Sequence, residues 1–301
     1  MANSILSLDN IVKTYDKNIA VDGVSFEVPR GSIFGLLGPN GAGKTSLIRI
    51  ITTITRADSG TVYLDGEKLG GSHPEQIGYM PEERGLYRKM KVGEHLTYLA
   101  RLKGLSAPLA REKIDYWLGK FEISDWWNKK VEELSKGMQQ KIQFIATVVH
   151  QPKLLILDEP FSGLDPVNTN LLKGEIHQLK EEGVSIIFST HRMEQVEEIC
   201  EHIVLIDKGR NVLEGRVKDI KNHFKKNLYR ISYSGELPDG LESRAEIVEQ
   251  TDHNITLQVG EQGQSNHLLQ YLLQQGVFIH SFNEILPTLN EIFIRQVQGE
   301  N

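Results

Sequence analysis

The segment "SIFGLLGPNGAGKTSLIRI" constrains the fold of this chain more than any other. Its apolar start is typical of a buried strand, and from Lys44 onward its apolar residues have helical spacing. Between them, Gly38 and, five residues later, Gly43-Lys44-Thr45 form a pattern in which backbone amides surround phosphate oxygens at the positive end of a helix. The segment therefore predicts a strand, a phosphate-binding loop (P-loop) and a helix.

The residue types in this loop suit a nucleotide. Small glycines let phosphates approach the backbone, Lys44 can reach the terminal phosphates, and Thr45 offers a hydroxyl to Mg²⁺. An ordinary glycine turn is the alternative, and the spacing together with the flanking elements disfavours it. We predict that the whole loop binds the nucleotide: Gly38, Pro39, Asn40, Gly41, Ala42, Gly43, Lys44, Thr45 and Ser46.

A second motif, "LLILDEP", places two acids at the end of an apolar strand. Asp158 is expected to hold Mg²⁺ bridging the phosphates, and Glu159 to orient or deprotonate an attacking water. By themselves, two acids at this position are equally typical of a charged turn that caps a core strand. The P-loop upstream favours the catalytic interpretation.

Strand-like and helical segments alternate through most of the chain. Apolar runs such as "KLLILDEP", "VSIIFSTH" and "HIVLIDKG" alternate with helical patterns, which predicts an α/β fold: a P-loop NTPase core with a mainly parallel sheet flanked by helices. The N-terminal runs "ILSLDNIVKTY" and "VSFEVPRGS" favour an antiparallel β edge. We predict a nucleotide-binding domain at 1–220 with a helical subdomain at about 90–138, and a small C-terminal α+β domain at 221–301.

Composition excludes several functional classes. The chain has 301 residues, which suits two domains, and a net charge of -6, which does not steer it toward nucleic acid. Its single cysteine, Cys200, is expected to pack as a small hydrophobic residue in a reducing compartment. No apolar run reaches the ~18 residues needed to cross a bilayer. No histidine belongs to a group with zinc-like spacing, so Mg²⁺ is the only metal expected.

Taken in order, these motifs resemble the ATP-binding subunit of an ABC transporter, over residues 5 to about 215. "LSKGMQQ" resembles the family's signature motif, which implies that Ser135 and Gly137 contact the γ-phosphate of ATP bound to the other subunit. "SGLD" resembles the loop that communicates across the dimer and ends at Asp165. His191 in "STH" matches a histidine that contacts the γ-phosphate, and Tyr15 matches an aromatic residue that stacks on adenine.

Two positions depart from the family pattern. Glu82 stands where the family usually has a glutamine that senses Mg²⁺ and the attacking water, so we assign Glu82 to both the cofactor and the metal site. In the signature motif, Lys136 and Met138 replace a glycine and a glutamine. Both departures, together with "PEERGLY", resemble bacterial exporter subunits that extrude sodium or drugs.

The resemblance implies a Mg²⁺-dependent ATPase in which Lys44, Glu159 and His191 are catalytic. It further implies separate transmembrane subunits and a homodimer or heterodimer with a similar ATPase chain, located in the cytoplasm at the inner face of the membrane. One alternative is a soluble ABC ATPase acting on nucleic acid or ribosomes. Another is a nucleotide-binding regulator that does not hydrolyse ATP.

Three further segments have both structural and functional interpretations. Trp126 and Trp127 are expected to pack at the edge of the helical subdomain, or else to line a groove that receives a helix of the membrane subunit. The lysine-rich "KDIKNHFKK" is expected to form a solvated helix between domains. The C-terminal domain resembles accessory domains of exporter ATPases, which suggests dimer stabilisation or regulation.

Overall fold

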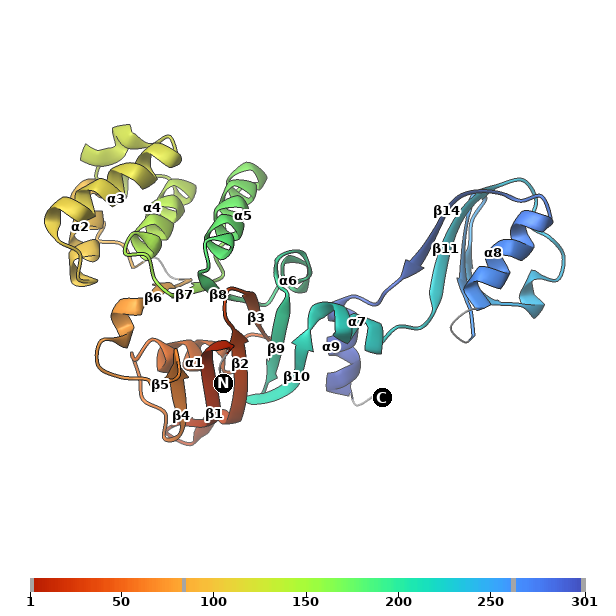
Figure 1. The fold of residues 1–301 in the computed structure, drawn as a ribbon, viewed down its shortest axis with the longest axis horizontal. Helices are drawn as coiled ribbons and strands as arrows, with labels where there is room; N and C mark the ends of the chain where they lie inside the picture. Colours follow the sequence, from red (N-terminus) through yellow and green to blue (C-terminus); the bar gives the residue numbers. More distant parts are fainter. Residues whose placement is uncertain (1–2, 83–84, 261–263, 299–301) are drawn as a thin grey trace. The chain divides into compact units, whose positions relative to one another are not determined.

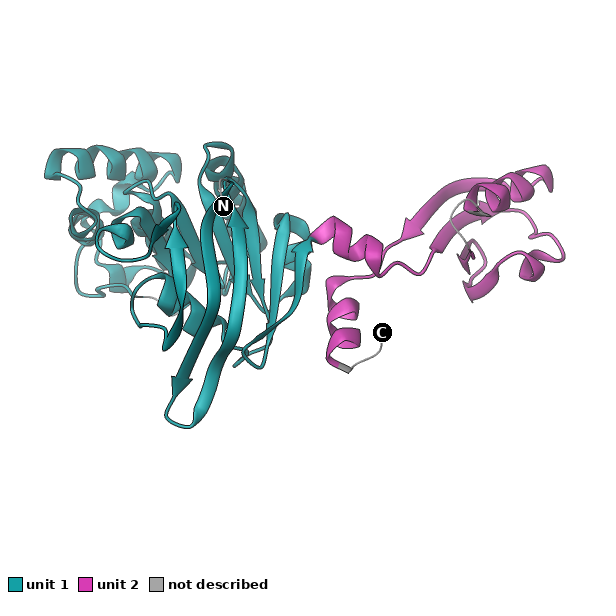
Figure 2. Cartoon of the chain, turned by 60° about the horizontal axis from the view of Figure 1, so that its bottom comes forward, with its two compact units in different colours: residues 1–216 teal, residues 217–301 magenta. Residues whose placement is uncertain are grey.

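The computed structural model describes residues 3–82, 85–260 and 264–298 of the chain. Figure 2 shows its two compact units, residues 1–216 and 217–301. The division lies four residues before the predicted boundary at 220. The assignment of these units to the two predicted domains stays a prediction.

The larger unit contains the predicted parallel sheet. This sheet has six strands in the order β10-β9-β3-β8-β7-β6, and only β10 runs antiparallel to its neighbour. The strands are β3 (Ile33–Leu37), β6 (Ile77–Met80), β7 (Leu154–Asp158), β8 (Ser185–Thr190), β9 (His202–Asp207) and β10 (Arg210–Arg216). The interior strands β3, β7 and β8 are buried along their whole length, as expected for a sheet covered on both faces.

A four-stranded antiparallel sheet accompanies it, as the N-terminal pattern predicts. Its order is β2 (Asn18–Pro29), β1 (Ser4–Tyr15), β4 (Ser59–Leu64) and β5 (Glu67–Lys68). Helix α1 (Lys44–Ile51) shares one hydrophobic cluster with residues of both sheets. Phe26 and Phe34, one from each sheet, stack with ring centroids 5.4 Å apart. This core anchors the loop that connects β3 to α1.

Helices form the remainder of the larger unit (Figure 1). The helical segment contains α2 (Val92–Leu102), α3 (Ala107–Lys120), α4 (Lys136–Val148) and the short 3-10 helices η2 (Ser124–Asn128) and η3 (Val131–Glu133). Outside it lie η1 (His73–Gln76), α5 (Pro166–Glu181) and α6 (Met193–Ile199). Helix α4 continues ten residues beyond the predicted end of the subdomain at 138. Trp117, Phe121 and Phe144 are in mutual ring contact and join α3 to α4.

The smaller unit is an α+β fold. Its antiparallel sheet has the order β12 (Glu246–Gln250), β13 (Asn254–Gln258), β11 (Leu228–Ser234) and β14 (Phe278–Ile285). The helices are α7 (Val217–His223), η4 (Leu241–Ser243), α8 (Gln264–Gln274) and α9 (Leu289–Gln298). Strand β14 carries a weak sequence signal, because its side chains do not alternate regularly between buried and exposed positions. A separate hydrophobic cluster, formed by residues of the sheet, η4 and α8, stabilises this unit.

His95, on α2, is a buried histidine with no hydrogen-bond partner for either ring nitrogen among the described residues. The ring of Tyr87 packs edge-on against it, with ring centroids 5.7 Å apart. Burial lowers the pKa of His95 from 6.5 to about 4. The folded chain therefore holds His95 neutral at a pH where an unfolded chain would protonate it.

We expect acidification to destabilise the protein partly through His95. The pKa of His95 is lower in the folded chain than in the unfolded chain. Its contribution to the free energy of unfolding is therefore lost as pH falls from about 6.5 toward about 4. Between about pH 7.5 and about pH 5 this loss should be about 2 kcal/mol. Urea unfolding at both pH values should show a smaller decrease for His95→Leu than for wild type. The exposed His267 provides the control, because His267→Leu should keep the wild-type decrease; an unchanged decrease in His95→Leu would contradict the assignment.

Candidate active site

The P-loop is held close against neighbouring backbone. Gly38 has a φ of 149° and Gly43 a φ of 110°, values that side chains rarely allow. A Cβ atom on Gly38 would lie 2.1 Å from the carbonyl oxygen of Ile206, and one on Gly43 would lie 2.4 Å from that of Ala20. Glycine at these two positions is therefore required by the packing of the loop as well as by its dihedral angles.

Lys44 is the first residue of α1 and is buried inside the loop. Its ammonium group donates hydrogen bonds to the carbonyl oxygens of Gly38 at 2.6 Å and Pro39 at 3.1 Å. Burial lowers the pKa of Lys44 from its usual value, and nearby carboxylates, those of Asp158 and Glu159 foremost, oppose this shift. The loop thus presents a dehydrated cation beside a cluster of acids.

The two acids predicted from "LLILDEP" are both buried and are held by consecutive hydroxyls of the next strand. Strands β7 and β8 pair in parallel with Asp158 opposite Ser189, whose hydroxyl donates to Asp158 Oδ1 at 2.8 Å. Thr190 donates in the same way to Glu159 Oε2 at 3.0 Å. Burial raises the pKa of Asp158, the Ser189 hydrogen bond opposes this, and the charge of Glu159 adds to it. A bound cation would favour the ionised form of Asp158.

His191 completes this arrangement directly after β8. Its backbone N-H donates to Glu159 Oε1 at 2.9 Å, and its ring Nδ1 lies 2.6 Å from the same oxygen. The backbone of Glu159 is left-handed, with a φ of 49°, which is unusual for this residue type. An unusual backbone conformation maintained by surrounding hydrogen bonds is common at functional sites. Both carboxylate oxygens of Glu159 are therefore oriented by the β8 end.

These residues surround one pocket with a volume of about 390 Å³ at the carboxyl ends of the parallel strands. Of the residues predicted to bind nucleotide, metal or water, the pocket is lined by Asn40, Gly41, Ala42, Gly43, Lys44, Thr45, Ser46, Glu82, Asp158, Glu159 and His191. Gly38 and Pro39 do not line the pocket; their carbonyl oxygens bind Lys44. A further wall, which sequence reasoning missed, comes from Asn18, Ile19, Ala20, Lys208 and Gly209. These residues belong to no local motif, because folding alone brings them to the P-loop.

Besides Gly38 and Pro39, four more of the predicted site residues do not line this pocket. Tyr15 lies at the end of β1, paired with Asn18, and is 39% exposed. Ser135 is the N-cap of α4, where its hydroxyl accepts from the backbone N-H of Met138 at 3.3 Å. Gly137 is the second residue of the same helix, and Asp165 is the N-cap of α5. The nucleotide contacts of all four stay predictions.

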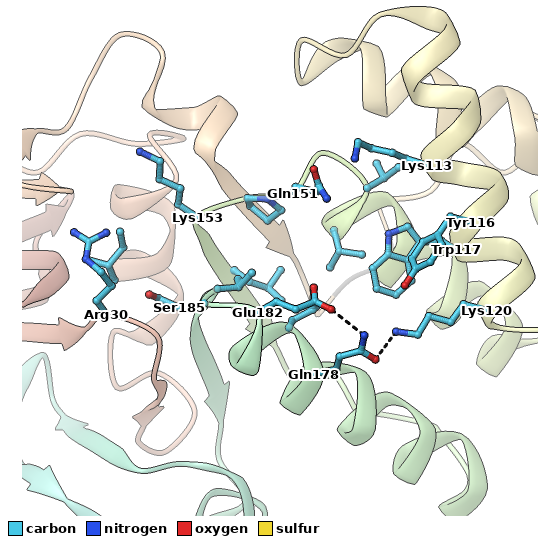
Figure 3. A pocket seen from close by; sticks show the side chains of 18 of the residues that line it. Arg30, Lys113, Tyr116, Trp117, Lys120, Gln151, Lys153, Gln178, Glu182 and Ser185 are labelled. Atoms are coloured by element: carbon cyan, nitrogen blue, oxygen red, sulfur yellow. Dashed lines mark hydrogen bonds between the residues drawn. The ribbon is translucent and has the colours of Figure 1, made fainter.

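A second cavity, with a volume of about 670 Å³, lies between α3, the carboxyl end of α5 and the amino ends of β7 and β8 (Figure 3). It contains none of the predicted site residues. Three of its polar side chains bind one another: Gln178 accepts from Lys120 at 2.7 Å and donates to Glu182 at 2.8 Å. Because the cavity borders the amino ends of the strands, it lies at the opposite end of the sheet from the P-loop.

Comparison with known proteins shows to which family this chain belongs. A family model described as ABC transporter matches residues 21–162, and one for the C-terminal domain of DrrA1-3-like ATP-binding proteins matches residues 215–297. The Bacillus subtilis ABC transporter ATP-binding protein YhaQ, itself uncharacterised, is 46% identical over 97% of this chain and 98% of its own length. This chain is an ABC transporter ATP-binding protein.

Two further comparisons extend this result. The Nod factor export ATP-binding protein I of Ralstonia nicotianae is 35% identical to this ABC ATPase over 73% of the chain and 69% of the relative. A solved ATP-binding subunit of an ABC transporter is 30% identical and superposes with a TM-score of 0.69, covering 73% of this chain and 93% of the other. The predicted fold class and the prediction of an ATP-binding, ATP-hydrolysing transporter subunit are confirmed.

The described part of this ABC ATPase contains no helix that is long and apolar enough to span a bilayer. The same residues contain no group of three or more histidine, cysteine or acidic side chains arranged to hold a metal ion. Cys200 is buried, and burial raises the pKa of its thiol. Its packing as a small hydrophobic residue agrees with the expectation from the sequence.

Proposed function

We propose that this ABC ATPase drives export through separate membrane subunits. The observation that carries the proposal is the pocket in which Lys44 and the P-loop face Asp158 and Glu159. Export itself is supported by the relative whose name gives Nod factor export. The transported substrate would be selected by the membrane subunits.

Hydrolysis would proceed by transfer of the γ-phosphoryl group to water. The P-loop amides and Lys44 would neutralise phosphate charge, and Glu159 would orient or deprotonate the water. The hydrogen bonds from Thr190 and the His191 backbone support this role, because they hold the Glu159 carboxylate in one orientation. His191, with its side chain 47% exposed at the pocket rim, would contact the γ-phosphate.

The pocket also fits Mg²⁺. This ion is usually held by one or two protein oxygens together with phosphate oxygens and waters, and not by a complete protein cage. The buried carboxylate of Asp158, the hydroxyl of Thr45 and the carboxylate of Glu82 supply such oxygens around the pocket. When bound, Mg²⁺ would neutralise charge on the transferred phosphoryl group.

A second ATPase chain would complete each nucleotide site. Ser135 and Gly137 begin α4 and lie outside the P-loop pocket, and so does Asp165. The positive end of α4 is free to face phosphate on another chain. We therefore propose a homodimer, or a heterodimer with a similar chain, in which Tyr15 stacks on adenine and each ATP lies between a P-loop and the partner's signature motif.

The membrane subunit would bind a groove beside α2. Gly93, Tyr98, Leu102 and Trp127 contribute to its lining, and its volume is about 630 Å³. A Cβ atom on Gly93 would lie 2.2 Å from the Trp127 ring, so glycine makes room for that ring. Tyr98 and Leu102 are 44% and 61% exposed, which gives the groove an apolar face. Docking there would place this chain at the inner face of the membrane.

This docking surface can be tested by co-purification. We expect tagged wild-type chain, solubilised from membranes of its native host with Mg-ATP, to recover a membrane-spanning protein in stoichiometric amount. Leu102→Arg should lose at least about 90% of that protein, because burying a charge in place of an apolar side chain at the contact costs several kcal/mol. Mass spectrometry measures the amount of membrane protein recovered with wild type and with the variant.

The matched control is Leu273→Arg, which changes a similarly exposed leucine, 56% exposed, on α8. It should recover the membrane protein as wild type does. Recovery of a soluble dimer alone, or of ribosomes, would overturn the proposed export through membrane subunits while leaving the ATPase function intact. Equal recovery with Leu102→Arg and with wild type would show that the membrane subunit does not bind this groove.

A further inference from the structure

Helix α4 carries two buried glutamines that the proposed mechanism does not yet use. Gln140 and Gln143 are 4% and 5% exposed and are three residues apart, so they lie on one face of the helix. The helix begins next to Ser135, at the signature motif. Whatever moves its first turn therefore moves both side chains with it, since a helix of this length behaves as a rigid element.

Each glutamine amide donates to the carbonyl oxygen of a proline just beyond a strand of the parallel sheet. Gln140 Nε2 binds the Pro160 oxygen at 2.9 Å, and Pro160 directly follows Glu159. Gln143 Nε2 binds the Pro81 oxygen at 2.7 Å, and Pro81 directly precedes Glu82. Proline has no N-H of its own to anchor these loops, so the carbonyl bonds are well placed to do so.

The spacing of the two glutamines matches the spacing of the strands. Side chains three apart on a helix are separated by ~5–6 Å, and neighbouring strands by ~4.8 Å. Strands β6 and β7 are adjacent and parallel, so the loops after them leave the sheet side by side. Helix α4 packs directly on β6, where a Cβ atom on Gly78 would lie 2.5 Å from the Thr147 oxygen. One helix face can thus hold both loops at once.

We propose that Gln140 and Gln143 are positioning residues that clamp α4 to the loops bearing Glu159 and Glu82. Contact between Ser135 and the nucleotide of a second chain then changes the position of both carboxylates, which couples dimer closure to hydrolysis. The clamp rests on the proposed dimeric mechanism. It assigns to these glutamines a role in the catalytic step and none in binding ATP to the P-loop of their own chain.

The test replaces each glutamine with methionine, which has similar length and volume but donates no hydrogen bond. Gln140→Met and Gln143→Met should each lower kcat for ATP hydrolysis at least about tenfold, because small displacements of catalytic groups have effects of this size. The affinity of the full chain for a fluorescent ATP analogue should stay within about twofold of wild type. Because the two bonds are separate, either variant alone tests the clamp if the other fails to fold.

Thr147→Val is the matched control on the same helix. Thr147 is also buried and its hydroxyl also donates to a carbonyl oxygen, that of Gln143 at 2.8 Å, but this bond stays within α4. Its kcat should remain within about twofold of wild type. A structural role alone would predict equal losses for all three variants, and that result would overturn the clamp.

A double-mutant cycle with Ser135→Ala separates coupling from general damage. If the clamp transmits the contact at Ser135, the effects of Ser135→Ala and Gln140→Met on kcat should combine to less than their product. Strictly multiplicative effects would contradict the clamp. An inactive wild type would instead refute the proposed function, whereas an active wild type with active glutamine variants would refute only the clamp.

Discussion

Replacing Glu159 with glutamine should lower kcat for ATP hydrolysis about 10³-fold while ATP still binds. In glutamine, the amide oxygen can accept from the His191 backbone while the amide N-H donates to the Thr190 hydroxyl, so the strand ends should keep their geometry. It cannot take a proton from water. We expect the loss because Glu159 is the carboxylate that β8 holds in a fixed orientation. Among the described residues that line the pocket, it alone accepts bonds from both Thr190 and the His191 backbone.

Phosphate release measures the loss, and gel filtration with Mg-ATP measures its consequence. Because ATP is not consumed, the variant should elute as a dimer under conditions where wild type returns to monomer. Glu182→Gln, at the end of α5 and in the other cavity, should hydrolyse ATP at the wild-type rate. Wild type and Glu159→Gln that are equally inactive would refute the hydrolytic function.

Replacing Gly43 with alanine should weaken ATP binding at least about 100-fold. The added Cβ atom would lie 2.4 Å from the Ala20 oxygen, at a backbone φ of 110°, so the loop must move. Movement of the loop displaces Lys44, whose ammonium group is held only 2.6 Å from the Gly38 oxygen. Amides that no longer converge on the phosphates cannot bind them as strongly.

Gly41→Ala is the comparison within the same loop. Gly41 also has a positive φ, of 79°, but a Cβ atom there would meet nothing within 4 Å. Its substitution should therefore weaken ATP binding about tenfold or less, through backbone strain alone. Isothermal titration of both variants measures the difference, and equal losses would show that close packing against Ala20 does not shape the loop.

Much of the nucleotide site was predictable because its signals are local. The P-loop needs only a few consecutive residues, and its glycines and Lys44 lie where the pattern places them. The two acids at the end of β7 and the histidine after β8 were also assigned from short segments. The parallel sheet then brings these separate ends together, because the carboxyl ends of parallel strands meet at one edge.

The P-loop, the pair of acids and the family were predictable from short segments, since each depends on residue types at short spacing. The folded chain alone shows which distant residues share a wall, such as Ile19 and Lys208 beside the P-loop. It also decided which carbonyl oxygens Gln140 and Gln143 bind. Such contacts depend on how helices and strands pack, and packing is set by the whole core and not by any segment of it.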